Sequence, residues 1–526
     1  MKKIHRIGLA VLSGLLFTIA WPSRGFAPFV FIALIPLLFL ENKIAKGEKA
    51  HVFWLAFLAF LVWNVGTTWW VWNATPAAIA AWVLNGFFMT VVFWLFHVTK
   101  KAICPNRWGN FILIPYWMAY ELFTYHWVGK WPWLNLGNVF STVHNWVQWY
   151  EFTGVAGGTL WVLLVNILLG NAFIAALGRD KKVSYRNSIA SGFAILLPLC
   201  LSFVMYNNYE EKGEDVEVIV VQQNCDPWNE QFDANQYRET LQRNISLAEP
   251  LLTDETRFVV SSESAIQEGI WWDDPESPWS VRCFRQFAHA HPQTAYVIGA
   301  TTMEWVPEGQ ENDFAARSIP NSSHSYYTHN SALLIDTLEM QHRNKSQLTP
   351  GVEAVPEWEF LKKSSLTVGI ARGTLKTDSV ATNMHFANHE IGVPICYESA
   401  FGGYVRQFTQ KGADLLFVIT NDGWWGDTPG YKQHFEFSKL RAIENRRCVA
   451  RSANTGKSGF FNQKGDVLQQ TSYWVPDAIR ETLKANTKIT FYARHGDYLF
   501  KGALIISILL LLALVIKSIV NGFRKS

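Results

Sequence analysis

Long apolar segments fill the first 206 residues and return near the carboxyl end. A membrane-spanning helix needs about 20 such residues, so each segment is predicted to cross a bilayer. The first follows "MKKIHR", but "TIAWPSRG" offers no small-residue cleavage site, and it is interpreted as a retained helix rather than a signal peptide. The eight segments lie at about 7–21, 26–40, 52–73, 76–98, 110–128, 159–178, 188–206 and 502–520.

Short β-rich runs replace the long apolar segments after residue 207. Helical patterns lie between several of them, and this alternation predicts an α/β layered domain. In the clearest helix, 434–446, one face carries Phe437, Leu440 and Ile443, and the charged residues are assigned to a solvated face (Glu436, Lys439, Arg441 and Glu444). Polar stretches at 306–329 and 372–389 are predicted loops. The predicted strands are 216–223, 257–262, 295–302, 331–336, 391–395, 414–420 and 448–453.

Composition supports a membrane protein with one water-exposed domain. Only 17% of the residues are charged, whereas soluble proteins have about 25%. We therefore predict a membrane domain of seven helices over 1–206, a soluble domain over 207–500, and an eighth helix with a tail over 501–526. A formal net charge of +3 without a basic stripe argues against nucleic-acid binding. Six cysteines without regular spacing form neither a zinc pattern nor a disulfide framework.

Lysine and arginine are frequent in every second predicted loop and rare in the loops between. Cytoplasmic loops carry an excess of these residues, so the amino terminus is placed inside the cell. The alternate loops, "NATPAA" and 129–158, are poor in both residues. The pattern then places 207–500 on the opposite side of the membrane. The basic residues assigned to the cytoplasm are Lys2, Lys3, Arg6, Lys43, Lys46, Lys49, Lys100, Lys101, Arg107, Arg179, Lys181, Lys182, Arg186, Arg524 and Lys525.

Three chemically useful residues lie near the ends of predicted strands. Glu263 follows "RFVVSS", Cys396 follows "IGVPI", and Lys345 comes after "SALLID". Side chains just beyond strand ends are where an α/β sheet collects its chemistry. Singly, each has an ordinary alternative: a helix cap for Glu263, a core thiol for Cys396 and a surface lysine for Lys345.

The order Glu–Lys–Cys, within "SSESA", "NKSQLTPGVE" and "ICYES", resembles the nitrilase superfamily. The segment 420–460, beginning "TNDGWWGD", is also similar to that superfamily. With the flanking membrane helices, the whole chain resembles the apolipoprotein N-acyltransferase family. The resemblance implies an α-β-β-α sandwich in which a sharp turn after a strand, the nucleophile elbow, presents Cys396.

The resemblance also implies a reaction. A fatty acyl chain moves from a membrane phospholipid to the α-amino group of the diacylglyceryl-cysteine that begins an apolipoprotein, the last step of bacterial lipoprotein maturation. Glu263 would be the general base, Cys396 the nucleophile that forms a thioester, and Lys345 the group that stabilises thiolate and oxyanion. We expect no cofactor and no metal, and a catalytic domain on the periplasmic face of the bacterial inner membrane.

Further residues receive supporting roles. Glu353 is assigned to positioning Lys345 or relaying protons, and Glu398 to orienting the elbow. The backbone N–H near Tyr397 is a candidate oxyanion donor. Trp424 and Trp228 are candidates for lining the acyl route, and "WPWLNLGN" (131–138) for forming a lateral entrance.

Two alternatives stay open at this point. A membrane-tethered amidase or nitrilase would use the same triad to hydrolyse a carbon–nitrogen bond. A transporter or receptor could carry an inactive enzyme domain; against it, the spans hold few charges of the kind that mark transport pathways, Glu121 being the chief exception. Pairing among Cys225, Cys283 and Cys448 is also left open.

Overall fold

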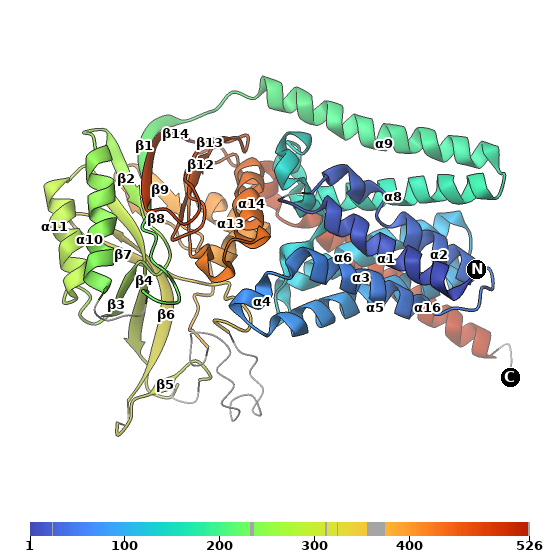
Figure 1. Ribbon diagram of the computed structural model, residues 1–526, viewed down its shortest axis with the longest axis horizontal. Coiled ribbons are helices and arrows are strands. Elements are labelled where there is room, and N and C mark those ends of the chain that lie inside the picture. The colour runs from blue at the N-terminus through green and yellow to red at the C-terminus, as the bar shows by residue number, and fades with distance from the viewer. Residues whose placement is uncertain (24, 232–235, 311–312, 323, 355–373, 524–526) are drawn as a thin grey trace. The chain divides into compact units, whose positions relative to one another are not determined.

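The computed structural model describes residues 1–23, 25–231, 236–310, 313–322, 324–354 and 374–523 (Figure 1). The chain forms two compact units. The helical unit comprises Met1–Trp72, Ala77–Asn208 and His495–Ser526. The sheet unit comprises Asn73–Pro76 and Tyr209–Arg494.

The helical unit consists of helices and short 3₁₀ turns. Within the described residues, six spans are long and apolar enough to cross a membrane: 3–20, 27–45, 78–103, 155–177, 181–208 and 498–521. The other two predicted segments form shorter helices, so the multi-pass helical architecture is confirmed. The elements are α1 (Lys3–Ala20), η1 (Ala27–Phe31), α2 (Ile35–Ala45), α3 (Val52–Thr68), α4 (Val71–Ala74), α5 (Ala78–Ile103), η2 (Arg107–Ile112), α6 (Leu113–His126), η3 (Pro132–Leu134), η4 (Leu136–Trp146), α7 (Tyr150–Thr153), α8 (Val155–Leu177), α9 (Lys181–Asn208) and α16 (Tyr498–Phe523).

Close packing, rather than exclusion of water, holds these helices together. Helix α1 packs on α3, α3 on α5, and α6 on both α5 and α16. A Cβ atom on Gly14 of α1 would lie 2.4 Å from the Ala59 carbonyl oxygen of α3, so glycine is required for this approach. Beside it, the rings of Phe17 and Trp63 stack with centroids 4.2 Å apart. Small residues at such contacts are typical of helices packed in lipid.

The segment 129–158, predicted as a loop, folds into η3, η4 and α7 inside the helical unit. Side chains satisfy its backbone. The buried Glu121 carboxylate accepts hydrogen bonds from the Leu136 backbone N–H (2.8 Å) and the Thr159 hydroxyl (2.6 Å). It also accepts one from the Trp117 indole (3.0 Å), and the Tyr150 hydroxyl donates to the Gly137 carbonyl (2.8 Å). Buried backbone groups need such partners, so Glu121 anchors this segment.

The sheet unit contains two sheets. The first has the order β14-β1-β2-β4-β6-β5, with β3 added to β4 and β7 to β6. The second has the order β13-β12-β11-β10-β9-β8. In the first sheet β1, β2 and β4 are parallel, and in the second β9, β10 and β11 are parallel. The first sheet's strands are β1 (Glu214–Gln222), β2 (Thr256–Val260), β3 (Ile266–Trp271), β4 (Ala295–Trp305), β5 (Arg317–Ser318), β6 (Ser325–Ile335), β7 (Met340–Asn344) and β14 (Asp477–Ala485); the second's are β8 (Met384–Phe386), β9 (His389–Gly392), β10 (Leu415–Thr420), β11 (Val449–Ala453), β12 (Gly459–Phe461) and β13 (Val467–Gln470).

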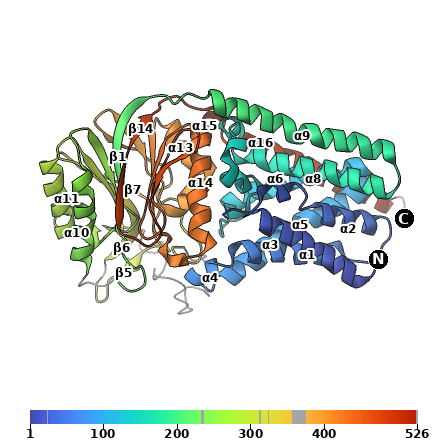
Figure 2. The ribbon, with the colours of Figure 1, turned by 45° about the horizontal axis from the view of Figure 1, so that its top comes forward.

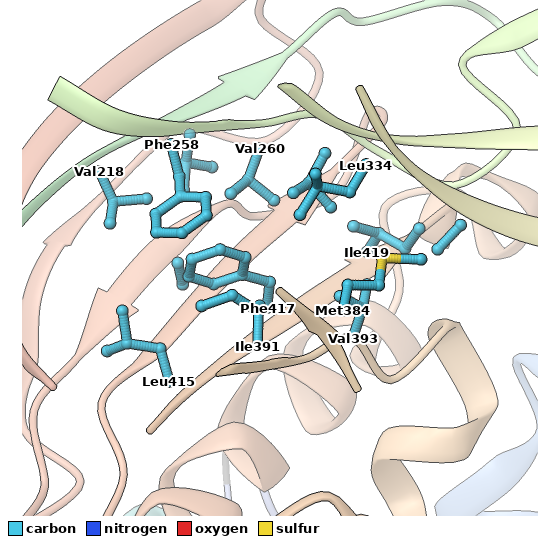
Figure 3. Close-up of a cluster of buried hydrophobic side chains, with 14 of the residues drawn as sticks. Val218, Phe258, Val260, Leu334, Met384, Ile391, Val393, Leu415, Phe417 and Ile419 are labelled. Carbon is cyan, nitrogen blue, oxygen red and sulfur yellow. The ribbon is translucent and has the colours of Figure 1, made fainter. Parts of the chain in front are cut away.

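Alternating residues of the strands fill two different cores. In β1, Val218 and Val220 lie in the core between the sheets, whereas Ile219 and Val221 face the helices on the other side. This is the period of two that a strand imposes on its side chains. Between the sheets the rings of Phe258 and Phe417 lie 5.2 Å apart, and Figure 3 shows them among aliphatic side chains of both sheets.

Helices cover both outer faces of the paired sheets (Figure 2). Helices α10 (Tyr237–Ala248) and α11 (Trp279–Ala290) pack on the first sheet. Helices α13 (Gly402–Gln410) and α14 (Pro429–Asn445) pack on the second. The predicted α-β-β-α sandwich is therefore confirmed. The remaining short helices are η5 (Glu249–Leu251), η6 (Cys396–Ala400), η7 (Asp422–Trp425) and α15 (Phe491–His495).

Three details of the sequence interpretation are wrong. Arg441 and Glu444 do not lie on a solvated face: both are buried, and the Arg441 Nε lies 3.0 Å from a Glu444 carboxylate oxygen. The predicted loop 306–329 ends in the first residues of β6, and 372–389 contains β8. Lys345 directly follows β7, an additional strand after "SALLID".

Candidate active site

The backbone at Cys396 turns sharply after the second sheet's strand β9. Ile395 still pairs with Ile419 of β10, and then Cys396 takes a φ of +50° as η6 begins. A left-handed conformation costs a residue with a side chain about 1–2 kcal/mol. A thiol that only filled the core would not need this turn. Although Cys396 is only 9% exposed, the strained turn supports presentation at the end of the inter-sheet core.

The Glu398 carboxylate, two residues further on, holds the elbow. It accepts hydrogen bonds from the backbone N–H groups of Ile395 (2.8 Å) and Ser346 (2.6 Å). The Arg343 guanidinium binds both of its oxygens, at 2.7 and 2.9 Å. Glu398 and Arg343 are fully buried, so removing one would leave the charge of the other buried without its counter-charge. This position suits the orienting role predicted for Glu398.

Glu263, Lys345 and Glu353 form one hydrogen-bonded cluster. The Lys345 ammonium lies 3.0 Å from a Glu263 oxygen and 2.9 and 2.8 Å from the two oxygens of Glu353. The Asn330 side-chain amide donates to both carboxylates, at 2.7 and 2.8 Å. Three residues that the sequence interpretation selected separately are thus brought together.

The two carboxylates differ in how completely they are used. A carboxylate offers about four acceptor positions. Glu353 fills four: two contacts from Lys345, one from Asn330 and one from the Thr349 backbone N–H (2.8 Å). Glu263 fills three, the third with the Asn421 backbone N–H at 2.9 Å. One acceptor position of Glu263 therefore remains for a proton, whereas Glu353 is committed to holding Lys345.

Burial and charge set the protonation states at the site. Burial raises the pKa of the Cys396 thiol, the Glu263 carboxylate raises it further, and the Lys345 ammonium opposes both. Burial works against the charge of Lys345, but Glu263 and Glu353 raise the pKa of Lys345 well above its usual value. Burial likewise opposes the charge of Glu353, yet Lys345 lowers the pKa of Glu353 overall. The resting site thus holds a protonated thiol, a cation and a nearby base.

The predicted substrate-contacting residues fall into two groups. The rings of Trp228 and Trp424 meet edge to face with centroids 4.9 Å apart, and Trp228 is 57% exposed. Tyr397 instead is buried, and its ring packs on Phe401 at 5.1 Å. Trp228 and Trp424 therefore form a single aromatic surface, whereas the Tyr397 ring belongs to the packed elbow.

Sequence interpretation missed several site residues. Asn330 lies inside β6, where nothing in the pattern distinguishes it from other strand residues. The backbone of Asn421, in "TND" directly after β10, binds Glu263. Asp422, His434 and Arg451 form a fully buried polar cluster next to the elbow. Of these, Asn421 and Asp422 could have been found from their place just after a parallel strand.

Two family models match separate parts of the chain. Residues 13–168 match the apolipoprotein N-acyltransferase N-terminal domain. Residues 285–487 match the carbon-nitrogen hydrolase family, a range that includes Lys345 and Cys396 and begins after Glu263.

Similar proteins match over nearly the whole length. The apolipoprotein N-acyltransferase of Chlorobaculum tepidum is 29% identical over 517 residues, which cover 93% of this chain and 92% of that protein. The apolipoprotein N-acyltransferase of Geobacter metallireducens is 25% identical over 515 residues, covering 93% and 91%. Among solved structures, an amidase from Nesterenkonia sp. AN1 (E41Q mutant) is 14% identical with a TM-score of 0.36, covering 55% of this chain and 99% of that one. Over nearly its whole length, the chain is thus similar to apolipoprotein N-acyltransferases.

Proposed function

We propose that this membrane enzyme transfers a fatty acyl chain from a phospholipid to the α-amino group of the diacylglyceryl-cysteine that begins an apolipoprotein. The observation that carries the proposal is the buried cluster of Glu263, Lys345 and Glu353 beside a cysteine on a left-handed turn. Similarity supports the substrate class, since the proteins that match over nearly the whole chain are named apolipoprotein N-acyltransferases.

In the first half-reaction, Glu263 accepts the Cys396 thiol proton at its remaining acceptor position. The sulfur attacks the ester carbonyl carbon of the phospholipid, and a C–S bond forms. The negative charge that develops on the carbonyl oxygen is stabilised by the Lys345 ammonium. When the tetrahedral intermediate collapses, the ester C–O bond breaks and the lysophospholipid alkoxide takes the proton from Glu263. A thioester on Cys396 remains.

In the second half-reaction, the acceptor amine attacks the thioester. An α-amino group has a pKa of about 7.7–8.0, so part of it is already neutral at pH 7. Glu263 takes a proton from the attacking amine, the C–S bond breaks, and the thiolate recovers that proton. Lys345 again stabilises the oxyanion. Glu353 holds Lys345 in place, and Asn330 holds Glu263. The two half-reactions share one site, so ping-pong kinetics are expected.

We also propose that the sheet unit lies outside the cytoplasm, on the periplasmic side of the inner membrane. The support is the alternation of basic loops. Two native cysteines test it. Cys283 lies in α11 of the sheet unit and Cys104 follows α5 in a predicted cytoplasmic loop; both are partly exposed. In spheroplasts, a membrane-impermeant maleimide should label Cys283 and spare Cys104, whereas the reverse pattern would contradict the orientation.

A labelled-lipid experiment separates transfer from hydrolysis. The purified protein is incubated with phospholipid carrying an isotope-labelled acyl chain and with a diacylglyceryl lipopeptide whose amine is free. The proposal predicts label in an amide on the lipopeptide. Release of labelled free fatty acid at the same rate with and without lipopeptide would instead support hydrolysis. A lipopeptide with an acetylated amine is the matched control and should remain unlabelled.

A further inference from the structure

A buried histidine lies against the backbone of the nucleophile elbow. His434, on α14, is fully buried, and its Nε2 lies 3.2 Å from the Cys396 carbonyl oxygen. The same nitrogen lies 2.8 Å from the Ser399 hydroxyl, which itself donates to that carbonyl at 2.7 Å. The contact therefore reaches the main chain of Cys396, not its sulfur.

The other ring nitrogen is fixed by two charged residues from different elements. Nδ1 of His434 lies 2.9 Å from an Asp422 carboxylate oxygen (η7) and 3.0 Å from Arg451 Nη2 (β11). The same Arg451 nitrogen lies 2.7 Å from the second Asp422 oxygen. All three side chains are fully buried. Such partners fix the plane of an imidazole and the nitrogen that carries its proton.

The partners on the two sides favour a proton on Nε2. Burial lowers the pKa of His434, and Arg451 lowers it further, so the ring is neutral near pH 7 and carries one proton. At Nε2 the Cys396 carbonyl can only accept, and the Ser399 hydroxyl gives its own proton to that carbonyl, so both contacts need a proton on Nε2. At Nδ1 the Asp422 carboxylate can only accept and the Arg451 nitrogen can only donate, so one of these two contacts is lost with either tautomer. With the proton on Nε2, the ring donates to Cys396 and its Nδ1 accepts from Arg451.

We propose that His434 is a positioning residue for acyl transfer: its Nε2–H holds the Cys396 carbonyl and so maintains the left-handed turn that presents the thiol. Asp422 and Arg451 act through His434 by fixing its ring. Holding the carbonyl matters because the turn is strained and would relax if its hydrogen bonds were lost. This inference deepens the proposed function and rests on it only for the identity of the substrates.

The test uses the reactivity of the Cys396 thiol, which needs no lipid substrate. The full-length protein is treated with iodoacetamide, and the alkylation rate at Cys396 is measured by peptide mass spectrometry. His434→Leu fills the space without donating, and the rate should fall about tenfold or more. In His434→Gln the amide N–H reaches the position of Nε2, and the rate should stay within about threefold of wild type. In acyl transfer, kcat should fall for His434→Leu with KM for phospholipid unchanged.

A second buried histidine provides the control. His389 begins β9 and lies 2.9 Å from Asp414, so it is also part of a buried His–Asp pair. His389→Leu should lower the thermal stability without changing the alkylation rate of Cys396.

The contrary outcomes are distinct. If folded His434→Leu is alkylated as fast as wild type, the inference is wrong, whatever the substrates are. If His434→Leu does not fold, His434→Asn replaces it, because its shorter amide reaches the position of Nδ1 only. Equal alkylation rates in the Asn and Gln variants would then overturn the inference. Failure of the proposed function alone would appear as normal Cys396 reactivity without lipid-derived product.

Discussion

Each of the two units buries a carboxylate, and the partners of the two carboxylates differ. In the helical unit, Glu121 is surrounded by neutral donors: an indole, a hydroxyl and a backbone N–H. In the sheet unit, Glu263 shares the Lys345 ammonium with Glu353. An indole, a hydroxyl and a backbone N–H do not exchange protons with a carboxylate near pH 7, whereas the remaining acceptor position of Glu263 is available to the Cys396 thiol. The comparison assigns an anchoring role to Glu121 and proton transfer to Glu263.

The comparison also bears on the transporter hypothesis. An ionisable residue inside a membrane domain is by default a candidate for an ion or proton pathway. Glu121 instead accepts from the Leu136 backbone N–H in the segment 131–146 and from side chains of two helices, Thr159 of α8 and Trp117 of α6. Burial of a charged residue therefore does not by itself mark a functional site. Its hydrogen-bond partners show whether its role is structural or functional.

The largest effect is expected on activity from Glu263→Gln. The amide keeps the size of the side chain and can still accept from the Asn421 N–H, but it cannot take the thiol proton. Acyl transfer should fall by about 10³-fold, the usual contribution of a general base, in protein that remains folded. Glu121→Gln is the matched control: it also exchanges a buried carboxylate for an amide and should leave acyl transfer near the wild-type rate. Similar loss of activity in both folded variants would remove the contrast between the units.

The next effect is expected on stability from Glu121→Leu. This change leaves the Leu136 N–H, the Thr159 hydroxyl and the Trp117 indole without their acceptor, at about 1–3 kcal/mol for each buried group. We expect a total loss of about 4 kcal/mol of unfolding free energy, measured by denaturation in detergent, and a smaller loss for Glu121→Gln. A Leu variant as stable as wild type would show that the anchor is dispensable.

A third prediction concerns the charged residues of α14. Arg441→Leu removes the guanidinium that pairs with the buried Glu444 carboxylate, and breaking a buried ion pair costs about 3–5 kcal/mol. We expect about 3 kcal/mol. Lys439→Leu, on the same helix with a pair nearer the solvent, should change stability by less than about 1 kcal/mol. If the two substitutions change the free energy of unfolding equally, in thermal or urea unfolding, Arg441 behaves as a solvent-exposed residue and the buried-pair explanation is wrong.

The smallest effect is a dependence of stability on pH. Lys345 lowers the pKa of Glu353 below its usual 4.5, against the opposing effect of burial. The folded carboxylate therefore stays charged at a pH where the unfolded one takes up a proton. The stabilisation is complete above about pH 4.5 and is lost as the pH falls through the lower folded value. Glu353→Gln should weaken the pH dependence of the unfolding midpoint between pH 6 and pH 3.5. If the midpoint varies with pH as in wild type, Glu353 does not contribute to the pH dependence of stability.

Local patterns were enough to predict much of this molecule. Strand ends are local features, so Glu263, Lys345 and Cys396 could be selected from short stretches of sequence, and the seven predicted strands all formed. Contacts between residues far apart in the chain could not be predicted from local patterns. Arg343 and Glu398, 55 residues apart, pair only because β7 lies beside the elbow.

The wrong predictions have physical causes. The pattern of α14 shows one apolar face, and its charged face was therefore assigned to solvent. In the fold that face is also covered, so Arg441 and Glu444 neutralise each other instead. Likewise, residues 131–146 were predicted as part of a loop, but they form the short helices η3 and η4. Two of their backbone groups bind Glu121 and Tyr150, contacts that no local pattern shows.

In the proposed reaction, the sulfur of Cys396 carries the acyl chain between donor and acceptor. Intact-mass spectrometry of the purified protein after incubation with phospholipid tests this directly. We expect a mass increase of one fatty acyl group, mapped to Cys396, that disappears when an amine-bearing lipopeptide is added and is absent in Cys396→Ala. An acylated lipopeptide formed at the wild-type rate by Cys396→Ala, without any adduct on the protein, would contradict it.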